Sequence, residues 1–361
     1  MKIERVRSLV VKLPQEEPLA GGKTTPGATR DFVVVKITTA DGIEGIGLTF
    51  FGGALTGVLK AAVDELGALL VGNDPRRTED IAQVLRNAAV SAGPGGIFTL
   101  ALSAIDIALW DIRGKAFNLP VATLLGGFRD RVPAYASGAL LRTQPLEDVA
   151  RAAGVLVERG FKQMKAQLAL LGDTSPAKEE ERIRLIRENA GPDAVIMVDI
   201  NQRWSVHEAI NIGQRIEKYH LAWLEDVTAH DDYSGLARVT SRLSTPVTGG
   251  EYVYGISPFR HMLEAHSVDI VMIDLVRVGG ITQWMKVAGM AEAFNRPVVS
   301  HLIPEIQLHL IAAVPNGMVV EYMPWTAKLF QDPPLPQNGE LTVPARPGLG
   351  LTFTREIDAG L

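Results

Sequence analysis

The sequence predicts an α/β protein in which a parallel (β/α) barrel follows a smaller mixed domain. At about 150 residues per domain, a chain of 361 residues has room for two. Strand-like runs precede helical blocks in its first part, whereas from Arg131 onward short β-branched runs alternate with amphipathic segments. Strands that alternate with helices of about 10 to 15 residues indicate βα units and therefore a parallel sheet.

Residues 1–128 are expected to form the smaller domain. An Asp41-Gly42 pair is typical of a hairpin between two of its strands. The expected strands are 6–13, 32–38 and 43–50, and the expected helices are 55–70, 78–90 and 98–117. Residues 14–30 are rich in Gly, Thr and Pro, a composition that fits either a surface connection or a lid.

Residues 129–325 are expected to form the barrel. The strand-like runs are RVPAYAS, FKQMKAQ, AVIMVDI, AWLE, TPVTGGE, DIVMID, PVVSH and MVVEY. Eight such runs in succession favour a closed barrel over an open sheet. The tail, residues 326–361, is rich in Pro and Gly, and we expect it to return to the first domain.

Composition excludes several classes of protein. The chain has 36 Lys and Arg against 41 Asp and Glu, and this excess of negative charge argues against nucleic-acid or anionic membrane partners. It has no cysteine, which excludes disulfides and thiolate sites and suits a reducing cytoplasm. Without a secretion signal or a run of about 18 apolar residues, we expect a soluble cytoplasmic protein.

Polar, mostly acidic residues close six successive strand-like runs. Asp199, Glu225 and Glu251 end three of them at intervals of 26 residues, about one βα unit. The next three runs end in Asp274, His301 and Glu321. One acidic residue at a strand end is most often a helix cap, but six in succession need another explanation. Because all strand C-termini of a (β/α) barrel open onto one face, we expect these groups to converge there.

Converging carboxylates repel one another and raise one another's pKa values unless a cation holds them together. Mg²⁺ is the simplest candidate, because it is a hard ion that prefers carboxylate oxygen and water. Asp199, Glu225 and Glu251 are assigned as its ligands because they lie on adjacent strands. The absence of histidine among the three makes zinc less suitable.

The neighbouring side chains indicate acid–base chemistry. An Asp274 hydrogen-bonded to His301 would fix the imidazole tautomer and make the other ring nitrogen a better base. Glu321 could bind a substrate oxygen or be structural. Lys165 shares its strand face with Gln167, so both point inward together and Lys165 could supply charge or relay a proton. Asn201, two residues past Asp199, also faces the mouth and could donate to substrate.

At this point the chain resembles the enolase superfamily and, within it, the mandelate racemase subgroup. The motifs that carry the resemblance are SAIDIALWDIRGKAFNLPVATLLGG (103–127), DINQRW, WLED, the GGE of TPVTGGE, DLVRVGGIT and SHLIPEIQLHL. The resemblance implies a (β/α)7β modified TIM barrel under an α+β capping domain built from both chain ends. It also implies Mg²⁺ on the three carboxylates, an Asp274–His301 base, and Glu321 at the substrate carboxylate. Residues 14–30 look like the substrate-closing loop of the family, whose members habitually form homo-oligomers.

One position departs from the racemase pattern. That pattern has Lys-x-Lys on the second barrel strand, whereas this chain has Lys165-Ala166-Gln167. Gln cannot exchange a proton, so one face of the substrate lacks a base unless Lys165 takes the role. Racemisation needs proton-transfer groups on both faces, whereas dehydration can use His301 alone. We therefore expect an acid-sugar dehydratase that converts a polyhydroxy acid to a 2-keto-3-deoxy product.

The favoured substrate is an aldarate such as talarate or galactarate, with Lys23 and Arg30 of the closing loop meeting its distal carboxylate. Three alternatives remain. Lys165 could serve as the second base of a 2-hydroxy acid racemase or epimerase. A muconate-type cycloisomerase is less favoured because that chemistry uses a lysine pair. A non-catalytic barrel is disfavoured because the three carboxylates and the Asp274–His301 pair are intact.

Overall fold

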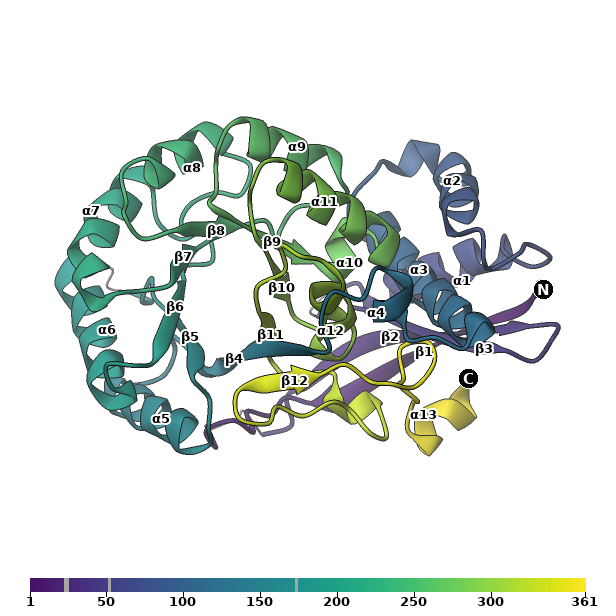
Figure 1. Cartoon of the computed structure of the whole chain (residues 1–361), viewed down its shortest axis with the longest axis horizontal. Helices are drawn as coiled ribbons and strands as arrows, with labels where there is room; N and C mark the ends of the chain where they lie inside the picture. Colours follow the sequence, from purple (N-terminus) through teal and green to yellow (C-terminus); the bar gives the residue numbers. More distant parts are fainter. Residues whose placement is uncertain (23–25, 51–52, 173–174) are drawn as a thin grey trace.

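The computed structural model describes residues 1–22, 26–50, 53–172 and 175–361. A ring of strands and helices forms one half of the molecule, and a small sheet with its own helices forms the other (Figure 1). Both chain termini lie in the second half, which we call the cap (Figure 1). In the described part of the chain, no helix is long and apolar enough to cross a membrane.

Eight parallel strands build the barrel, in the order β10-β9-β8-β7-β6-β5-β4-β11. Their bounds are β4 Arg131–Leu140, β5 Gln163–Gln167, β6 Val195–Asp199, β7 Trp223–Glu225, β8 Val247–Gly249, β9 Ile270–Asp274, β10 Val298–His301 and β11 Val320–Tyr322. The two ends of this order, β10 and β11, are joined by hydrogen bonds from the Met318 amide to the carbonyl oxygen of Val298 over 2.9 Å and from the Glu321 amide to Ser300 Oγ over 2.7 Å. All eight match the runs expected from the sequence.

Helices follow the first seven of these strands and cover the outside of the ring (Figure 1). They are α5 Leu146–Glu158, α6 Pro176–Ala190, α7 Val206–Ile216, α8 Tyr233–Thr240, α9 Ser257–Glu264, α10 Leu275–Val278 with α11 Ile281–Ala293, and α12 Pro304–Ala313. The short 3₁₀ helix η2, Glu217–Tyr219, extends α7. After β11 the chain leaves the ring, so the expectation of a (β/α)7β barrel is confirmed.

The cap consists of a three-stranded antiparallel sheet and helices packed on it. Its elements are β1 Ile3–Pro14, β2 Thr29–Thr39, β3 Glu44–Thr49, α1 Thr56–Ala68, α2 Thr78–Ala88, η1 Val90–Ala92, α3 Gly96–Phe117 and α4 Val121–Leu124. Gly47 on β3 allows α3 to lie directly on the sheet, because a Cβ there would be 2.0 Å from the carbonyl oxygen of Ala104. The tight packing of β3 against α3 therefore requires glycine at this position.

The C-terminal segment contacts both halves of the molecule. Its strand β12, Glu340–Thr342, pairs antiparallel with β4, and η3 spans Ala327–Leu329. Its last helix, α13 Arg355–Gly360, lies against the cap, where Arg7 Nη1 donates to the carbonyl oxygen of Leu361 over 3.0 Å. The cap is therefore held together by segments from opposite ends of the sequence.

A layer of apolar side chains fills the barrel interior. It consists of Tyr135, Met197, Trp223, Ile270, Met272, Val299 and Val319, all 5% exposed or less. Because side chains on a strand alternate between its two faces, the residue two positions later points into the barrel one layer higher. This apolar floor therefore sets the height at which the next inward residues stand.

His309 on α12 is a fully buried histidine that joins the barrel to the cap and the tail. Its Nδ1 accepts from the Ala122 amide over 3.2 Å, so Nε2 donates to the carbonyl oxygen of Leu349, 3.0 Å away. Burial lowers the pKa of His309 from 6.5 to about 4. The imidazole is therefore neutral in the folded protein over a pH range in which it is protonated in the unfolded chain.

This difference predicts a loss of stability in acid. Below pH 6.5 the unfolded chain takes up a proton that the folded protein excludes until about pH 4, so stability falls as the pH falls through this window. A shift of this size is worth about 3 kcal/mol. We expect His309→Gln, which can still donate to Leu349, to be less stable than the wild type at pH 7 and to lose most of that deficit by pH 4. Urea unfolding of both proteins at the two pH values measures this, and a constant difference would contradict it.

Candidate active site

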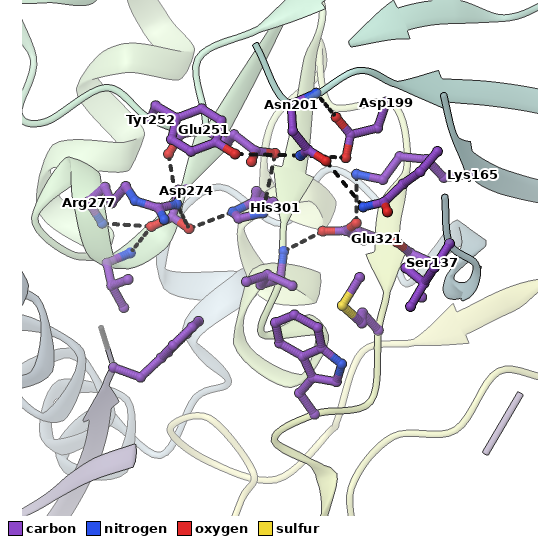
Figure 2. A pocket seen from close by; sticks show the side chains of 18 of the residues that line it. Ser137, Lys165, Asp199, Asn201, Glu251, Tyr252, Asp274, Arg277, His301 and Glu321 are labelled. Carbon is purple, nitrogen blue, oxygen red and sulfur yellow. Dashed lines mark hydrogen bonds and ion pairs between the residues drawn. The ribbon is translucent and has the colours of Figure 1, made fainter. Parts of the chain in front are cut away.

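A cavity of about 300 Å³ opens at the C-terminal ends of the barrel strands. Ionisable side chains from several strands point into it (Figure 2). Four of them follow a residue of the apolar floor by two positions on the same strand, and so does Glu225, which is fully buried beside the cavity. These pairs are Met197 and Asp199, Trp223 and Glu225, Met272 and Asp274, Val299 and His301, and Val319 and Glu321. Phe50 and Leu100 of the cap also line the cavity, so the site lies where the two halves meet.

His301 and Asp274 end β10 and β9 and are register partners in the sheet. His301 Nδ1 lies 2.6 Å from Asp274 Oδ2. The other oxygen, Oδ1, accepts from the Val276 amide over 2.9 Å, which fixes the carboxylate. Burial alone would raise the pKa of Asp274, but Arg277 and His301 together hold it below its usual value. A charged Asp274 keeps the proton of the neutral imidazole on Nδ1, so Nε2 carries the free lone pair.

Lys165 reaches from β5 between two carboxylates. Its Nζ lies 2.5 Å from Glu225 Oε1 and 2.8 Å from Glu321 Oε1. Burial lowers the pKa of Lys165, but the two carboxylates outweigh it and hold the pKa well above its usual value. For Glu321 burial acts in the opposite direction and raises the pKa, but Lys165 and His301 outweigh it and bring the pKa below its usual value. Lys165 and Glu321 therefore stand as a charged pair.

Of the three carboxylates expected to bind metal, Asp199 and Glu251 line the cavity, and Glu225 is buried beside it. Asp199 and Glu225 are register partners at the ends of β6 and β7, and Glu251 follows the end of β8. Burial and the repulsion of neighbouring acids raise the pKa of Glu225 to about 7 and that of Glu251 well above its usual value. Oε2 of Glu251 has no hydrogen-bond partner among the described residues, although His301 Nε2 approaches to 3.3 Å.

This donor set fits a hard divalent cation, because it offers buried carboxylate oxygens, and burial together with the repulsion of neighbouring acids raises the pKa values of Glu225 and Glu251. The described side chains do not yet form an ion cage: no three His, Asp or Glu groups among them are gathered closely enough to hold one metal. One reason is visible in the geometry, since Glu225 is turned to Lys165 and also accepts from Trp223 Nε1 over 3.0 Å.

Gln167 and Asn201 both reach the cavity and contact each other. Gln167 Nε2 donates to Asn201 Oδ1 over 3.2 Å. Asn201 Nδ2 donates in turn to Asp199 Oδ2 over 2.7 Å, and the Asn201 amide donates to Oδ1 over 2.8 Å. The backbone of Asn201 has φ 49°, a left-handed conformation that asparagine tolerates. Asn201 therefore orients the carboxylate of Asp199, a contact that the spacing alone did not indicate.

Of the two residues assigned to a distal carboxylate, one can be placed, and it does not line this cavity. Lys23 lies outside the described residues. Arg30 lies on β2, and its guanidinium stacks on the ring of Trp325, 3.4 Å from the centroid, while burial lowers its pKa to about 10. Trp325 lines the cavity and Arg30 does not, so the ring of Trp325 lies between the Arg30 guanidinium and the cavity. Sequence could not show this, because Trp325 comes nearly 300 positions later.

Arg277, Tyr252 and Asp226 were not singled out from the sequence. Arg277 Nη1 lies 3.4 Å from Asp274 Oδ2 and donates to the carbonyl oxygen of Glu251 over 3.0 Å. The guanidinium also lies 5.2 Å from the ring centre of Tyr252, beside Glu251 in Figure 2. Asp226 is buried directly after Glu225, and one of its oxygens has no partner among the described residues. Tyr252 and Asp226 each directly follow a predicted site residue, and Arg277 lies three positions after one. This closeness in the sequence is the signal that could have indicated them.

Comparison with known proteins gives matches to both halves of the chain. Residues 5–126 match the mandelate racemase/muconate lactonizing enzyme N-terminal domain, and residues 147–357 match the enolase C-terminal domain-like family. The two matches follow each other in the same order as the cap and the barrel.

Characterised relatives match over almost the whole chain. An L-talarate/galactarate dehydratase of Salmonella typhimurium is 31% identical, covering 98% of this chain and 90% of the relative. A 3,6-anhydro-alpha-L-galactonate cycloisomerase of Streptomyces coelicolor is 32% identical, covering 98% of each. The crystal structure of an L-talarate dehydratase from Polaromonas sp. JS666, complexed with Mg and L-glucarate, has a TM-score of 0.91 and 30% identity, covering 99% of this chain and 96% of that one.

Proposed function

We propose that this chain, which belongs to the mandelate racemase/muconate lactonizing enzyme family of the enolase superfamily, is a Mg²⁺-dependent acid-sugar dehydratase. The observation that carries the proposal is that, among the described residues at the site, one side chain is set up as a base. His301 is oriented through Nδ1 by Asp274, whereas Lys165 is held between Glu225 and Glu321. Gln167 stands where a second lysine would serve the opposite face.

Asp199, Glu225 and Glu251 are the proposed Mg²⁺ ligands. To hold the ion, Glu225 would exchange the ammonium group of Lys165 for the metal. A bound Mg²⁺ acts as a Lewis acid toward the substrate carboxylate and so makes the neighbouring α-hydrogen more acidic. Asn201 would keep Asp199 in place through its two hydrogen bonds.

His301 would then move one proton twice. Its Nε2 takes the proton from the carbon α to the carboxylate, and the charge developing on the carboxylate lies near the ammonium group of Lys165. The same Nε2 then gives this proton to the hydroxyl on the β-carbon, which leaves as water. The resulting enol tautomerises to the 2-keto-3-deoxy acid. The net reaction is loss of one water, with no oxidant or second base.

The substrate class follows from size and polarity. A cavity of about 300 Å³ suits a small polyhydroxy acid, and its polar lining can hydrogen-bond several hydroxyl groups. Among acid sugars we favour an aldarate such as talarate or galactarate, in line with the names of the relatives. Arg30 remains a candidate for the distal carboxylate only if the ring of Trp325 moves aside; Lys23 remains a prediction from the sequence.

The proposal is tested by incubating the protein and Mg²⁺ with a panel of aldonic and aldaric acids and detecting 2-keto acids as semicarbazones. We expect a keto product from at least one aldarate. Recovered substrate should carry little solvent deuterium at the α-carbon, because deprotonation commits the molecule to loss of hydroxide. Deuterium incorporation with inversion and no keto acid would instead identify an epimerase that uses Lys165. Isomerisation of an anhydro sugar acid without net loss of water would identify a cycloisomerase, the activity named for one relative.

A further inference from the structure

A second, larger cavity of about 520 Å³ lies between the cap and the barrel. Helix α2 and helix α3 of the cap form one side of it, and α9 and α11 of the barrel form the other. It shares a wall with the active site: Gly255 lines the second cavity, and its amide donates over 3.2 Å to the carbonyl oxygen of Arg277, which lines the first. None of the residues assigned to metal, proton transfer or substrate lies in it.

The floor of this cavity contains a polar group whose hydrogen-bonding capacity is unused. Gln283 on α11 lines the cavity and is 4% exposed, and its Nε2 has no hydrogen-bond partner among the described residues. A buried amide without a partner is costly, so such groups normally have one. Rotation about the last side-chain bond turns this donor toward the cavity without moving the backbone. The floor can therefore donate to a bound acceptor.

Two cations add positive charge to the cavity, and part of its lining is apolar. Arg86 on α2 and Lys286 on α11 both line it, although Lys286 Nζ also lies 2.7 Å from Glu79 Oε1. Helix α9 begins there at Ser257. Its second residue, Pro258, has no amide hydrogen, but the other amides of its first turn are free donors and carry the partial positive charge of a helix N-terminus. The apolar part of the floor comes from Phe98 and Leu102 of α3.

From this combination we propose that the second cavity binds a small organic carboxylate with an apolar body. The carboxylate meets Arg86, the start of α9 and the amide of Gln283, and the apolar body packs on Phe98 and Leu102. The occupant is an anion because every charged side chain lining the cavity is a cation. It has an apolar body because Phe98 and Leu102 line the cavity and offer that body two large apolar side chains to pack on.

Isothermal titration of the full chain with benzoate, in buffer containing Mg²⁺, tests the proposal. The variants are Arg86→Ala, Gln283→Leu and Asp199→Asn, and the matched control is Arg77→Ala, an exposed arginine that pairs with Asp80 outside the cavity. We expect Arg86→Ala to weaken binding about tenfold, equivalent to about 1.4 kcal/mol. Gln283→Leu should also weaken binding while leaving the melting temperature unchanged or higher, because it removes an unpaired buried donor. Arg77→Ala should bind as the wild type does.

Asp199→Asn separates this cavity from the active site, where a carboxylate could also bind. Binding that persists in Asp199→Asn but weakens in Arg86→Ala supports the second cavity. Binding that disappears in Asp199→Asn and is unchanged in Arg86→Ala overturns the proposal and places benzoate in the active site. No binding to the wild type overturns it as well. Benzyl alcohol, the neutral analogue, should bind more weakly than benzoate, and equal binding would contradict the role of the cations.

Discussion

His301→Asn is expected to lower kcat for dehydration by about 10²–10⁴, because it removes the group proposed to carry the proton in both steps. Asn is smaller than His and cannot accept a proton at neutral pH. Asp274 would lose its contact with Nδ1 but keep the amide donors of Val276 and Arg277, so the carboxylate should stay in place. We therefore expect KM to change far less than kcat.

The measurement compares His301→Asn with His261→Asn, which changes a half-exposed histidine on α9. Steady-state rates with the best aldarate give kcat and KM, and deuterium in the recovered substrate detects any proton abstraction that is not followed by loss of water. Both dehydration and any exchange at the α-carbon should fall together in His301→Asn and stay normal in His261→Asn. Retained exchange in His301→Asn would mean that another group, with Lys165 the first candidate, abstracts the proton.

Removing the divalent ion is expected to abolish turnover, and Mg²⁺ should restore it. The acidic α-hydrogen depends on a cation at the substrate carboxylate, and Lys165 is already shared between Glu225 and Glu321. Asp199→Asn should weaken Mg²⁺ binding by about 100-fold or more, since even partners of metal ligands are worth about 10- to 100-fold. It should also lose activity at Mg²⁺ concentrations that saturate the wild type.

Calorimetric titration with Mg²⁺ measures this directly and does not depend on knowing the substrate. The matched control is Asp193→Asn, an exposed acidic residue just before the start of β6, at the opposite end of the strand from Asp199. Equal Mg²⁺ affinity in Asp199→Asn and Asp193→Asn would remove Asp199 from the ligand set. Full activity after exhaustive chelation would reject the metal-dependent mechanism altogether.

Most of the barrel could be predicted because its signals are local. Each strand-like run is short, apolar and bounded by turn residues, and most helices between them show one apolar face. Helix α12 gives no such signal, because all ten of its residues, Pro304–Ala313, are buried and the amphipathic pattern that marks a surface helix is absent. His309 on this helix is fully buried, but nothing in the neighbouring sequence distinguishes it from a surface histidine.

In the active site, too, some features follow from the local sequence and others depend on the tertiary structure. The sequence by itself determined which side chains share the layer above the apolar floor, because a two-residue period and a common direction of parallel strands are enough to place a strand's last residue. Only the tertiary structure decided how those side chains pair. It turned Lys165 to Glu225 and Glu321, tied Asn201 to Asp199, and stacked Arg30 on Trp325. The physical reason is that strand position is set by neighbours in sequence, whereas these contacts join residues from separate segments whose approach depends on how the whole barrel and cap pack.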